Sequence, residues 1–421
     1  MVKRLTLPNG LRIILAPRPA SVAATVLILV EAGSEYETKK INGISHFLEH
    51  LVFKGTAKRP EPGMIASELD KLGAEYNAFT GQEYTGYWAK AQHKEALKIL
   101  EVVSDLYLNP IFNSAEIDRE RGVIIEEINL YEDTPARRVH ELFTTLLYGD
   151  QPAGWDIAGE KSVIRRVSRE EIIRYRTAHY VAPATVVVIS GKFDAHEATR
   201  RVRELFGRLG RGRKARKPKT RAHQRRPGSL VKYKESDQSH LVLGARAFSV
   251  FDARRYALEV LADVLGGGMS SRLFRKVREE LGAAYYVRAD ADLYLDHGYL
   301  AVAAGVDHLK IRRVVAIILE EMRRLTTRLV GQAELKKAQD HLAGTLLLGL
   351  ETSDELASFY GGQEILTRTI LSPEEFIGKI QKVGAEEVRQ VARRLFRNEG
   401  LNLAVIGPYK RPQVFKKILK F

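Results

Sequence analysis

The amino-acid sequence predicts an α+β protein of two homologous domains, each a mixed β-sheet packed with α-helices. Three observations lead to this prediction. The chain has 421 residues and is 45% hydrophobic, which is ordinary for proteins that bury sizeable cores. Segments rich in β-branched residues stand at matching places in its two halves. A strongly basic stretch separates those halves.

Four apolar segments are expected to form corresponding strands of the two copies. They read TVLILVEAGS and TVVVISGKFD in the first half and LVLGARAFSV and LNLAVIGPYK in the second, at residues 25–34, 185–194, 241–250 and 401–410. Between them each half has a helix that ends at glycine, then a strand region, a long helix and an acidic-polar helix. At the N-terminus, two short strands flank Pro8, Asn9 and Gly10, the chemistry of a tight hairpin turn.

The basic stretch sets the expected domain limits. Residues 208–226 carry ten Lys or Arg and no acid, so this segment is expected to be an exposed linker. We therefore expect an N-terminal domain at residues 1–207, a basic linker at 208–228 and a C-terminal domain at 229–421. A nucleic-acid-binding arm is the functional alternative for the linker. Because the segment has neither interleaved aromatic residues nor a reading module around it, no nucleic-acid partner is expected.

Composition excludes several kinds of site. The chain has no cysteine, so disulfides and thiolate ligands are excluded, and any metal must be held by His and carboxylates. The longest apolar run, residues 21–30, is half of what a membrane-spanning helix needs and is rich in β-branched residues, so a buried strand is expected there. The N-terminal turn interrupts any signal-peptide core. We therefore expect a cytoplasmic protein without a membrane partner.

The segment GISHFLEHLVFKG, residues 43–55, combines an apolar stripe with a polar triplet. Its apolar residues recur at the spacing of a core-facing helix. His46, Glu49 and His50 fall on the other side, with the two histidines one turn apart. The triplet is either an ordinary solvated face or part of a metal site.

The second half of the sequence helps to decide between a solvated face and a metal site. When Gly55 is aligned with Gly266, the apolar residues Ala257, Val260 and Leu261 stand where the first copy has His46, Glu49 and His50. The fold can therefore use this helix without polar residues. The asymmetry favours a metal site in the first copy.

A catalytic zinc normally has three protein ligands, so two histidines require a third group. The candidate is a carboxylate from SAEIDRERGVIIEEINLYED, residues 114–133, whose apolar residues repeat at helical spacing. Glu120 and Glu127 lie two turns apart on nearly one side of this helix. One of them could bind metal while the other supports the site; paired acids on a helix are otherwise more often solvent-facing.

The pattern HFLEH is an H-x-x-E-H sequence, the inverted form of the H-E-x-x-H zinc-peptidase signature, and Glu127 follows His50 by 77 residues. With TLPNGLRII, NAFTGQEYTGY, ERGVIIEEI and SSRLFRKVREELGAAYYV, these residues resemble landmarks of the pitrilysin or insulinase family of zinc peptidases, the M16 class. The resemblance covers nearly the whole chain. It points in particular to half-length members similar to bacterial processing proteases and the mitochondrial processing peptidase, and hence to a prokaryotic protein.

The resemblance implies a zinc-dependent endopeptidase that acts on peptides or unfolded polypeptide segments. It implies one Zn²⁺ per chain, with His46, His50 and Glu127 as ligands, Glu49 as general base and Glu120 as supporting carboxylate. A carboxylate that is not a ligand suits the base, because the water must give up a proton that the leaving amine later receives. The alternative function is a non-catalytic structural or chaperone-like subunit of the same fold, but such relatives characteristically lose the zinc residues.

The resemblance also implies substrate-binding residues outside the zinc motif. Arg278 and Tyr285 are expected to hold the peptide carbonyl from the second domain, although the residues alone suggest a surface arginine and a strand tyrosine. Asn77 and Ala78 match a strand that pairs with substrate. An edge strand can bind an extended peptide through its backbone, but propensity does not distinguish an edge strand from an internal one.

The number of domains in the chain bears on the partners that we expect. Full-length relatives enclose substrate between four such domains, whereas this chain supplies two. The resemblance therefore implies a homodimer, or a heterodimer with an inactive family member, acting on a peptide substrate.

Overall fold

The computed structural model describes residues 2–411 and 413–421. The described residues form two compact units, each with one mixed β-sheet and helices packed on it, which confirms the predicted α+β class. The first unit comprises the described residues of Met1–Asn129, Trp155–Pro218 and Leu348–Leu371, and the second those of Leu130–Gly154, Lys219–Leu347 and Ser372–Phe421.

The first unit contains a six-stranded sheet in the order β1-β2-β6-β3-β5-β4. Its strands are β1 (Lys3–Thr6), β2 (Arg12–Pro17), β3 (Ala23–Val30), β4 (Glu75–Thr80), β5 (Thr85–Gln92) and β6 (Thr185–Gly191). Strands β2 and β6 are parallel and the other neighbours are antiparallel. The chain turns between β1 and β2 at Gly10, whose φ of 95° suits glycine, so the predicted N-terminal hairpin is confirmed. The predicted buried strand at residues 21–30 is β3.

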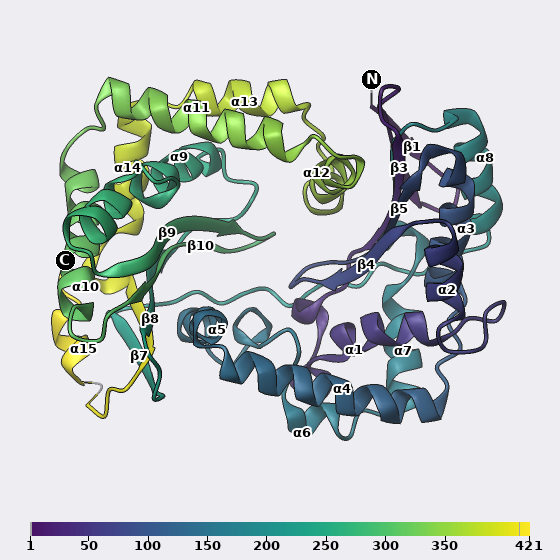
Figure 1. The fold of residues 1–421 in the computed structure, drawn as a ribbon, viewed down its shortest axis with the longest axis horizontal. Helices are drawn as coiled ribbons and strands as arrows, with labels where there is room; N and C mark the ends of the chain where they lie inside the picture. The colour runs from purple at the N-terminus through teal and green to yellow at the C-terminus, as the bar shows by residue number, and fades with distance from the viewer. Residues whose placement is uncertain (1, 412) are drawn as a thin grey trace. The chain divides into compact units, whose positions relative to one another are not determined.

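Helices cover both faces of this sheet (Figure 1). Helix α3 (Ala96–Leu108) packs on β3 and β5, and α8 (Ala195–Phe206) packs on β2. Helix α12 (Ser353–Leu366) covers the opposite face against β3 and β6. The unit also contains α1 (Ile44–Leu51), α2 (Met64–Lys71), α6 (Lys161–Ile164), α7 (Arg169–His179), most of α4 (Ser114–Asp133), and the short helices η1 (Ser34–Tyr36), η2 (Lys39–Ile41), η3 (Val52–Lys54), η4 (His93–Glu95) and η6 (Ala182–Ala184).

The second unit repeats the topology of the first. Its sheet has the order β7-β11-β8-β10-β9, with β7 (Gly228–Tyr233), β8 (Ser239–Arg246), β9 (Ala284–Leu293), β10 (Gly298–Val306) and β11 (Leu401–Gly407). Strands β7 and β11 are parallel and the others antiparallel. Strand for strand this matches β2-β6-β3-β5-β4, so the predicted internal repeat is confirmed.

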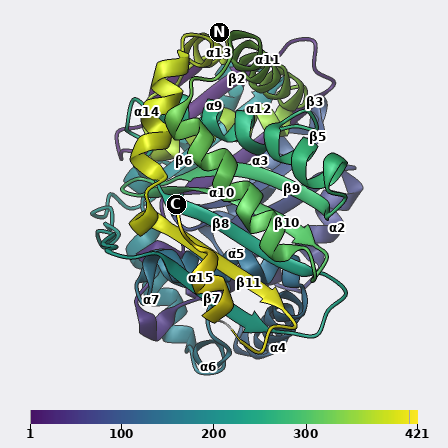
Figure 2. The ribbon, with the colours of Figure 1, turned by 90° about the vertical axis from the view of Figure 1, so that its left-hand side faces the viewer.

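Helices of the second unit again cover both faces of a sheet. On one face, α9 (Arg255–Gly266), α10 (Ile311–Thr327) and α14 (Ala385–Leu395) share a large apolar core with the strands, and Figure 2 shows α10 and α14 in front of them. Helix α5 (Pro135–Tyr148) packs on β7, β8 and β11 from the other face. The remaining elements are α11 (Gln332–Gly349), α13 (Pro373–Gln381), α15 (Gln413–Ile418), η5 (Pro152–Gly154), η8 (Asn398–Gly400) and the π-helix η7 (Phe274–Glu280).

Each sheet is completed by a helix from the other half of the sequence. Phe143 and Leu147 of α5 are buried in the core of the second unit, and Ala357 and Tyr360 of α12 are buried in the core of the first. The contiguous limits expected at residues 1–207 and 229–421 therefore do not describe the compact units. An amphipathic helix shows which of its faces is apolar but not which sheet that face will cover, so the exchange could not be expected from periodicity. As limits of the two sequence repeats, those boundaries stay a prediction.

The basic segment has no helix or strand between residues 208 and 227, but it is not uniformly exposed. The side chain of Lys217 is only 7% exposed, with its Nζ 2.5 Å from a carboxylate oxygen of Glu35 and 2.6 Å from one of Glu83. Lys214 pairs with the buried Glu31. The prediction of an exposed linker is wrong for Lys217, because nearby carboxylates compensate its burial, and Lys214 is only partly exposed. Among the described helices, none combines the length and apolar character needed to cross a membrane.

Candidate metal centre

Helix α1 presents the polar triplet on one side and an apolar stripe on the other. Its apolar side chains are at most 2% exposed, which confirms the predicted core-facing stripe of Ile44, Phe47, Leu48 and Leu51. The helix follows Gly43, whose φ is 95° and where a Cβ would lie 2.6 Å from the carbonyl oxygen of Ala158. Only glycine fits this position without strain, so the backbone fixes where α1 begins.

A buried carboxylate caps the start of α1. Glu37 is 1% exposed, and its Oε2 accepts the Gly43 N–H at 2.7 Å while its Oε1 accepts the Ser45 N–H at 2.8 Å. An acceptor at this place satisfies N–H groups that have no partner within the helix. Burial raises the pKa of Glu37 to about 7, and its hydrogen bonds with Ser45 and Gly43 oppose that shift. Glu37 was not predicted as a capping residue, because it lies six residues before Gly43 and outside the spacing of a local capping box.

The structure brings His46, His50 and Glu127 together from α1 and α4. Nε2 of His46 lies 3.5 Å from Oε2 of Glu127, and Nε2 of His50 lies 3.3 Å from the same oxygen. The three side chains offer ligand atoms that all lie within 4.8 Å of one another. Two imidazole nitrogens and a carboxylate are a donor set that suits a catalytic zinc site, so these residues fit the metal that the sequence led us to expect.

Glu120 lies behind His50 rather than in the ligand group. Its Oε2 is 3.2 Å from Nδ1 of His50, and its Oε1 is 2.6 Å from Nζ of Lys54. The side chain of Glu120 is 5% exposed. A carboxylate that contacts the far nitrogen of a histidine orients the ring and leaves Nε2 facing the site.

The electrostatics of this group favour positive charge. Burial lowers the pKa of His50, but its contacts with Glu127 and Glu120 outweigh burial and leave the pKa above its ordinary value. The carboxylates thus stabilise a cationic ring. The same negative surroundings would favour a bound metal cation.

Glu49 lies beside the ligand group. Its Oε2 accepts a hydrogen bond from the Thr80 hydroxyl at 2.6 Å. Burial raises the pKa of Glu49, and the negative charge of Glu127 adds to the shift, while Thr80 and His50 oppose it. A carboxylate with a raised pKa and one fixed oxygen is suited to accept and release a proton.

The strand β4 lies at one edge of the six-stranded sheet and packs against α1. Asn77 and Ala78 belong to this strand, paired with Trp88 and Tyr87 of β5. The structure thus favours the edge position that the sequence left open. Side chains alternate along a strand, so Ala78 shares a face with Thr80. The Ala78 N–H donates to the side-chain oxygen of Asn77 at 2.9 Å.

Arg278 and Tyr285 lie in the second unit, in η7 and β9. The guanidinium of Arg278 is 5.8 Å from the centre of the Tyr285 ring, and Tyr285 is 74% exposed. The two side chains thus form a cation–π pair within their unit. Their role toward substrate stays a prediction.

Two polar residues of the centre were not found from the sequence. Lys54 follows His50 by one helical turn, and that spacing was a signal that could have identified it. Thr80 gave no such signal, because its contact with Glu49 depends on how β4 packs against α1.

Comparison with known proteins places the chain in a family. Residues 12–161 match the family described as Insulinase (Peptidase family M16), and residues 166–342 match the Peptidase M16 inactive domain. YmxG of Bacillus subtilis, named an uncharacterized zinc protease, is 34% identical over 97% of this chain and 98% of its own length. The chain belongs to peptidase family M16. A second M16 relative, an uncharacterized zinc protease of Streptomyces coelicolor, is 35% identical over 98% of this chain and 91% of its own length.

Solved structures show the same M16 fold. A protease from Helicobacter pylori superposes with a TM-score of 0.89 at 20% identity, covering 97% of this chain and 99% of the other. A peptidase M16 inactive domain from Pseudomonas fluorescens superposes with a TM-score of 0.88 at 17% identity, covering 97% and 98%. The resemblance drawn from HFLEH and its flanking segments is therefore confirmed at the level of family and fold.

Proposed function

We propose that this M16 chain is a zinc-dependent endopeptidase that hydrolyses peptides or unfolded polypeptide segments. The observation that carries the proposal is the convergence of His46, His50 and Glu127 on one point, with Glu49 beside them. The zinc-protease names of relatives that match along nearly the whole chain support it.

In this proposal His46, His50 and Glu127 hold one zinc ion per chain. When bound, zinc lowers the pKa of a water molecule and polarises a carbonyl group. Glu120 keeps the His50 ring oriented through Nδ1, and Lys54 holds the other oxygen of Glu120 in place. The two contacts together restrict the orientation of the His50 ring.

Glu49 is the proposed general base. Its carboxylate takes a proton from the attacking water as the new C–O bond forms, and later passes that proton to the leaving amine as the peptide C–N bond breaks. The Thr80 hydroxyl holds one Glu49 oxygen at 2.6 Å and leaves the other oxygen for this proton. Burial strengthens the carboxylate as a base, because it raises the pKa.

Substrate binding is proposed at β4 and at the Arg278 and Tyr285 pair. Asn77 and Ala78 lie on an edge strand next to α1, where an extended peptide can pair with backbone groups. Arg278 and Tyr285 are proposed to stabilise the negative charge that develops on the carbonyl oxygen. Both features recognise backbone atoms, so they favour extended peptides over folded proteins.

The test of this proposal measures zinc binding and peptide cleavage separately. We expect the purified chain to contain about one zinc and to cleave an unstructured peptide. Glu49→Gln should retain zinc and lower kcat by about a hundredfold or more, the range of general acid–base groups. Glu126→Gln, at an exposed acid next to the ligand Glu127, is the matched control and should behave as the parent does. A zinc-loaded parent that cleaves no peptide would favour the non-catalytic subunit instead.

We also propose that the active form is a homodimer, or a heterodimer with an inactive family member. The support is the resemblance to half-length members, which associate to complete an enclosure. Cleavage per chain should fall on dilution as the oligomer measured by sedimentation dissociates. Full activity in a strict monomer would contradict the proposal, and activity that appears only with a co-expressed relative would select the heterodimer.

A further inference from the structure

The first turn of α1 depends on groups outside the helix. Helix α1 has eight residues, a length at which an isolated helix is marginal in water. Its N-cap residue is Gly43, which has no side chain to accept an N–H of the first turn. His46, a proposed zinc ligand, follows this cap by three residues. The place of the ligands therefore depends on what holds the first turn.

Glu37 supplies the acceptors that this turn lacks, and it uses both of its oxygens to do so. Its Oε2 accepts the Gly43 N–H at 2.7 Å and the side-chain amide of Asn42 at 3.0 Å. Its Oε1 accepts the Ser45 N–H at 2.8 Å. The Asn42 amide also donates to the carbonyl oxygen of Asp156 at 3.2 Å. A glutamine could not replace this carboxylate, because its side chain has one acceptor and one donor group.

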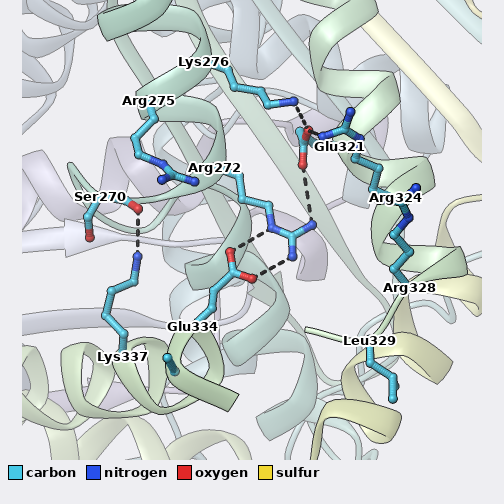
Figure 3. Close-up of a pocket in the computed structure, with 11 residues that line it drawn as sticks. Ser270, Arg272, Arg275, Lys276, Glu321, Arg324, Arg328, Leu329, Glu334 and Lys337 are labelled. Carbon is cyan, nitrogen blue, oxygen red and sulfur yellow. Dashed lines mark hydrogen bonds and ion pairs between the residues drawn. The ribbon is translucent and has the colours of Figure 1, made fainter. Parts of the chain in front are cut away.

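Glu37 differs from buried glutamates that are paired with cations. Glu321 is 2% exposed and lies 2.5 Å from Lys276 Nζ, a pair that Figure 3 shows. Glu364 is fully buried and lies 2.8 Å from a guanidinium nitrogen of Arg4. Within the described chain, the hydrogen-bond partners of Glu37 are neutral groups instead. Charge pairing therefore does not explain the burial of Glu37, whereas the needs of the first turn of α1 do.

The residue directly before His46 is held on two sides. The N–H of Ser45 donates to Glu37, and its Oγ lies 2.7 Å from the hydroxyl oxygen of Tyr175 in α7. Both Ser45 and Tyr175 are buried. His46 and His50 extend from the same short helix, so a displacement of its first turn would move their rings. Zinc–ligand distances vary by only about 0.2 Å between sites, so such a displacement would alter the coordination.

We propose that Glu37 is a positioning residue of the metal centre. Through the N–H groups of Gly43 and Ser45 it fixes where α1 begins, and it thereby places the rings of His46 and His50. The inference rests on the proposed function, because these histidines are ligands in that proposal. The hydrogen bonds of Glu37 reach neither ring, so it acts through the backbone. An effect on the reaction is still expected, because a misplacement of about 1 Å can lower a rate about a hundredfold.

The test loads the chain with cobalt(II), whose visible absorption depends on the geometry of its ligands, whereas zinc has no preference set by d-electrons. Measurements at pH 8 keep Glu37 mostly ionised, because burial raises its pKa to about 7. Glu37→Gln should bind cobalt with an altered spectrum and hold zinc about tenfold less tightly. Its kcat should fall about tenfold or more. Its KM should stay near that of the parent, because the substitution leaves β4 intact.

The matched control is Glu364→Gln, which makes the same change at a buried glutamate of the same unit. Glu364 pairs with Arg4 and Arg12 of β1 and β2, so its loss should lower the unfolding temperature. The cobalt spectrum, zinc affinity and kcat of this control should match the parent. A second variant, Asn42→Ala, removes one donor to Glu37 and leaves both backbone contacts in place. It should change the spectrum in the same direction but less, which tests the proposal even if Glu37→Gln does not fold.

Two results would overturn the role of Glu37 and leave the endopeptidase proposal standing. The first is a Glu37→Gln protein with the cobalt spectrum, zinc affinity and kcat of the parent. The second is an equal change of spectrum in Glu37→Gln and Glu364→Gln, which would mean that any loss of stability disturbs the site. A parent that binds neither cobalt nor zinc would instead overturn the proposed zinc site, and the role of Glu37 with it.

Discussion

Corresponding helices of the two units differ sharply in what they bury. Helix α1 packs against β4 and α9 against β9, and β4 and β9 occupy the same place in matching sheets. On α1, His46 and His50 contact Glu120 and Glu127 of α4. The residues aligned with the polar triplet on α9 are at most 3% exposed and apolar, namely Ala257, Val260 and Leu261.

The second unit also lacks the acids that contact the histidines in the first unit. When the helix 114–127 is aligned with 331–344, as the repeat suggests, Glu120 and Glu127 correspond to Lys337 and Gly344. The second unit therefore lacks every member of the ligand set and still builds the same sheet and the same helix. The apolar stripe of α1 is what the fold requires. Its polar face is what the proposed metal centre requires.

The largest effect is expected when the polar triplet of α1 is replaced by the corresponding residues of α9. A triple variant with His46→Ala, Glu49→Val and His50→Leu should fold, because the corresponding helix buries these types. It should lose zinc and peptide cleavage altogether. Metal analysis and circular dichroism of the purified variant check both expectations. A triple variant that still binds one zinc per chain would place the metal elsewhere.

A second prediction concerns the acid behind His50. Glu120→Gln keeps the size of the side chain but weakens its contacts with His50 Nδ1 and Lys54. Zinc affinity should fall about tenfold to a hundredfold, on the scale of partners that orient a ligand. Competition with a zinc-binding dye measures the change. Glu126→Gln on the same helix should leave the affinity unaltered, and an equal loss in both variants would remove the special role of Glu120.

A third prediction tests the role of Thr80, which lies in β4. Thr80→Val removes the hydroxyl that donates to Glu49 while keeping a β-branched residue in the strand. We expect kcat to fall by about tenfold to a hundredfold, because a hydrogen bond to a charged group contributes about 1.5–3 kcal/mol. Zinc content should not change. Thr80→Ser retains the hydroxyl and should restore most of the rate, whereas equal loss in both variants would show that packing, not the hydrogen bond, matters.

Sequence reasoning succeeded where the signal was local. The helix at residues 44–51, its buried stripe and the facing histidines follow from spacing along a few turns. Glu127 was singled out by the helical repeat and the resemblance, and the structure then brought it beside both histidines. Thr80 and the capping Glu37 were missed, because their contacts depend on packing between segments distant in the sequence.

The exchange of α5 and α12 shows the same limit at the level of domains. Each helix has an apolar face, and each could have covered the sheet of its own half. Which sheet each helix covers depends on tertiary packing, and the spacing of apolar residues along the helix does not show it. The burial of Lys217 in the basic segment was missed for the same reason, since Lys217 meets Glu35 and Glu83 only after folding.

The smallest expected effect concerns a carboxyl group of α9 at a position where α1 has an apolar residue. In the alignment of Gly55 with Gly266, Glu259 stands where α1 has the core residue Leu48. Burial raises the pKa of Glu259 to about 7, with Asp292 and Asp290 adding to the shift and Arg255 opposing it. The folded chain therefore holds this proton more tightly than the unfolded chain does.

Because the folded state binds more protons, Glu259 costs stability as pH rises from about 4.5 to about 7. Glu259→Gln resembles the protonated acid and does not titrate, so parent and variant should unfold together near pH 4.5 and separate above it. The variant should be more stable at pH 8 by the order of 1 kcal/mol, because solvent screens this partly exposed group. For a chain of this length that difference corresponds to about 1 °C in the unfolding temperature. Calorimetry in a chelator keeps zinc out of the comparison. Glu279→Gln, at an exposed acid of η7, should show no such divergence. Parallel profiles for parent and Glu259→Gln would mean that α9 buries its carboxyl group without a cost that depends on pH.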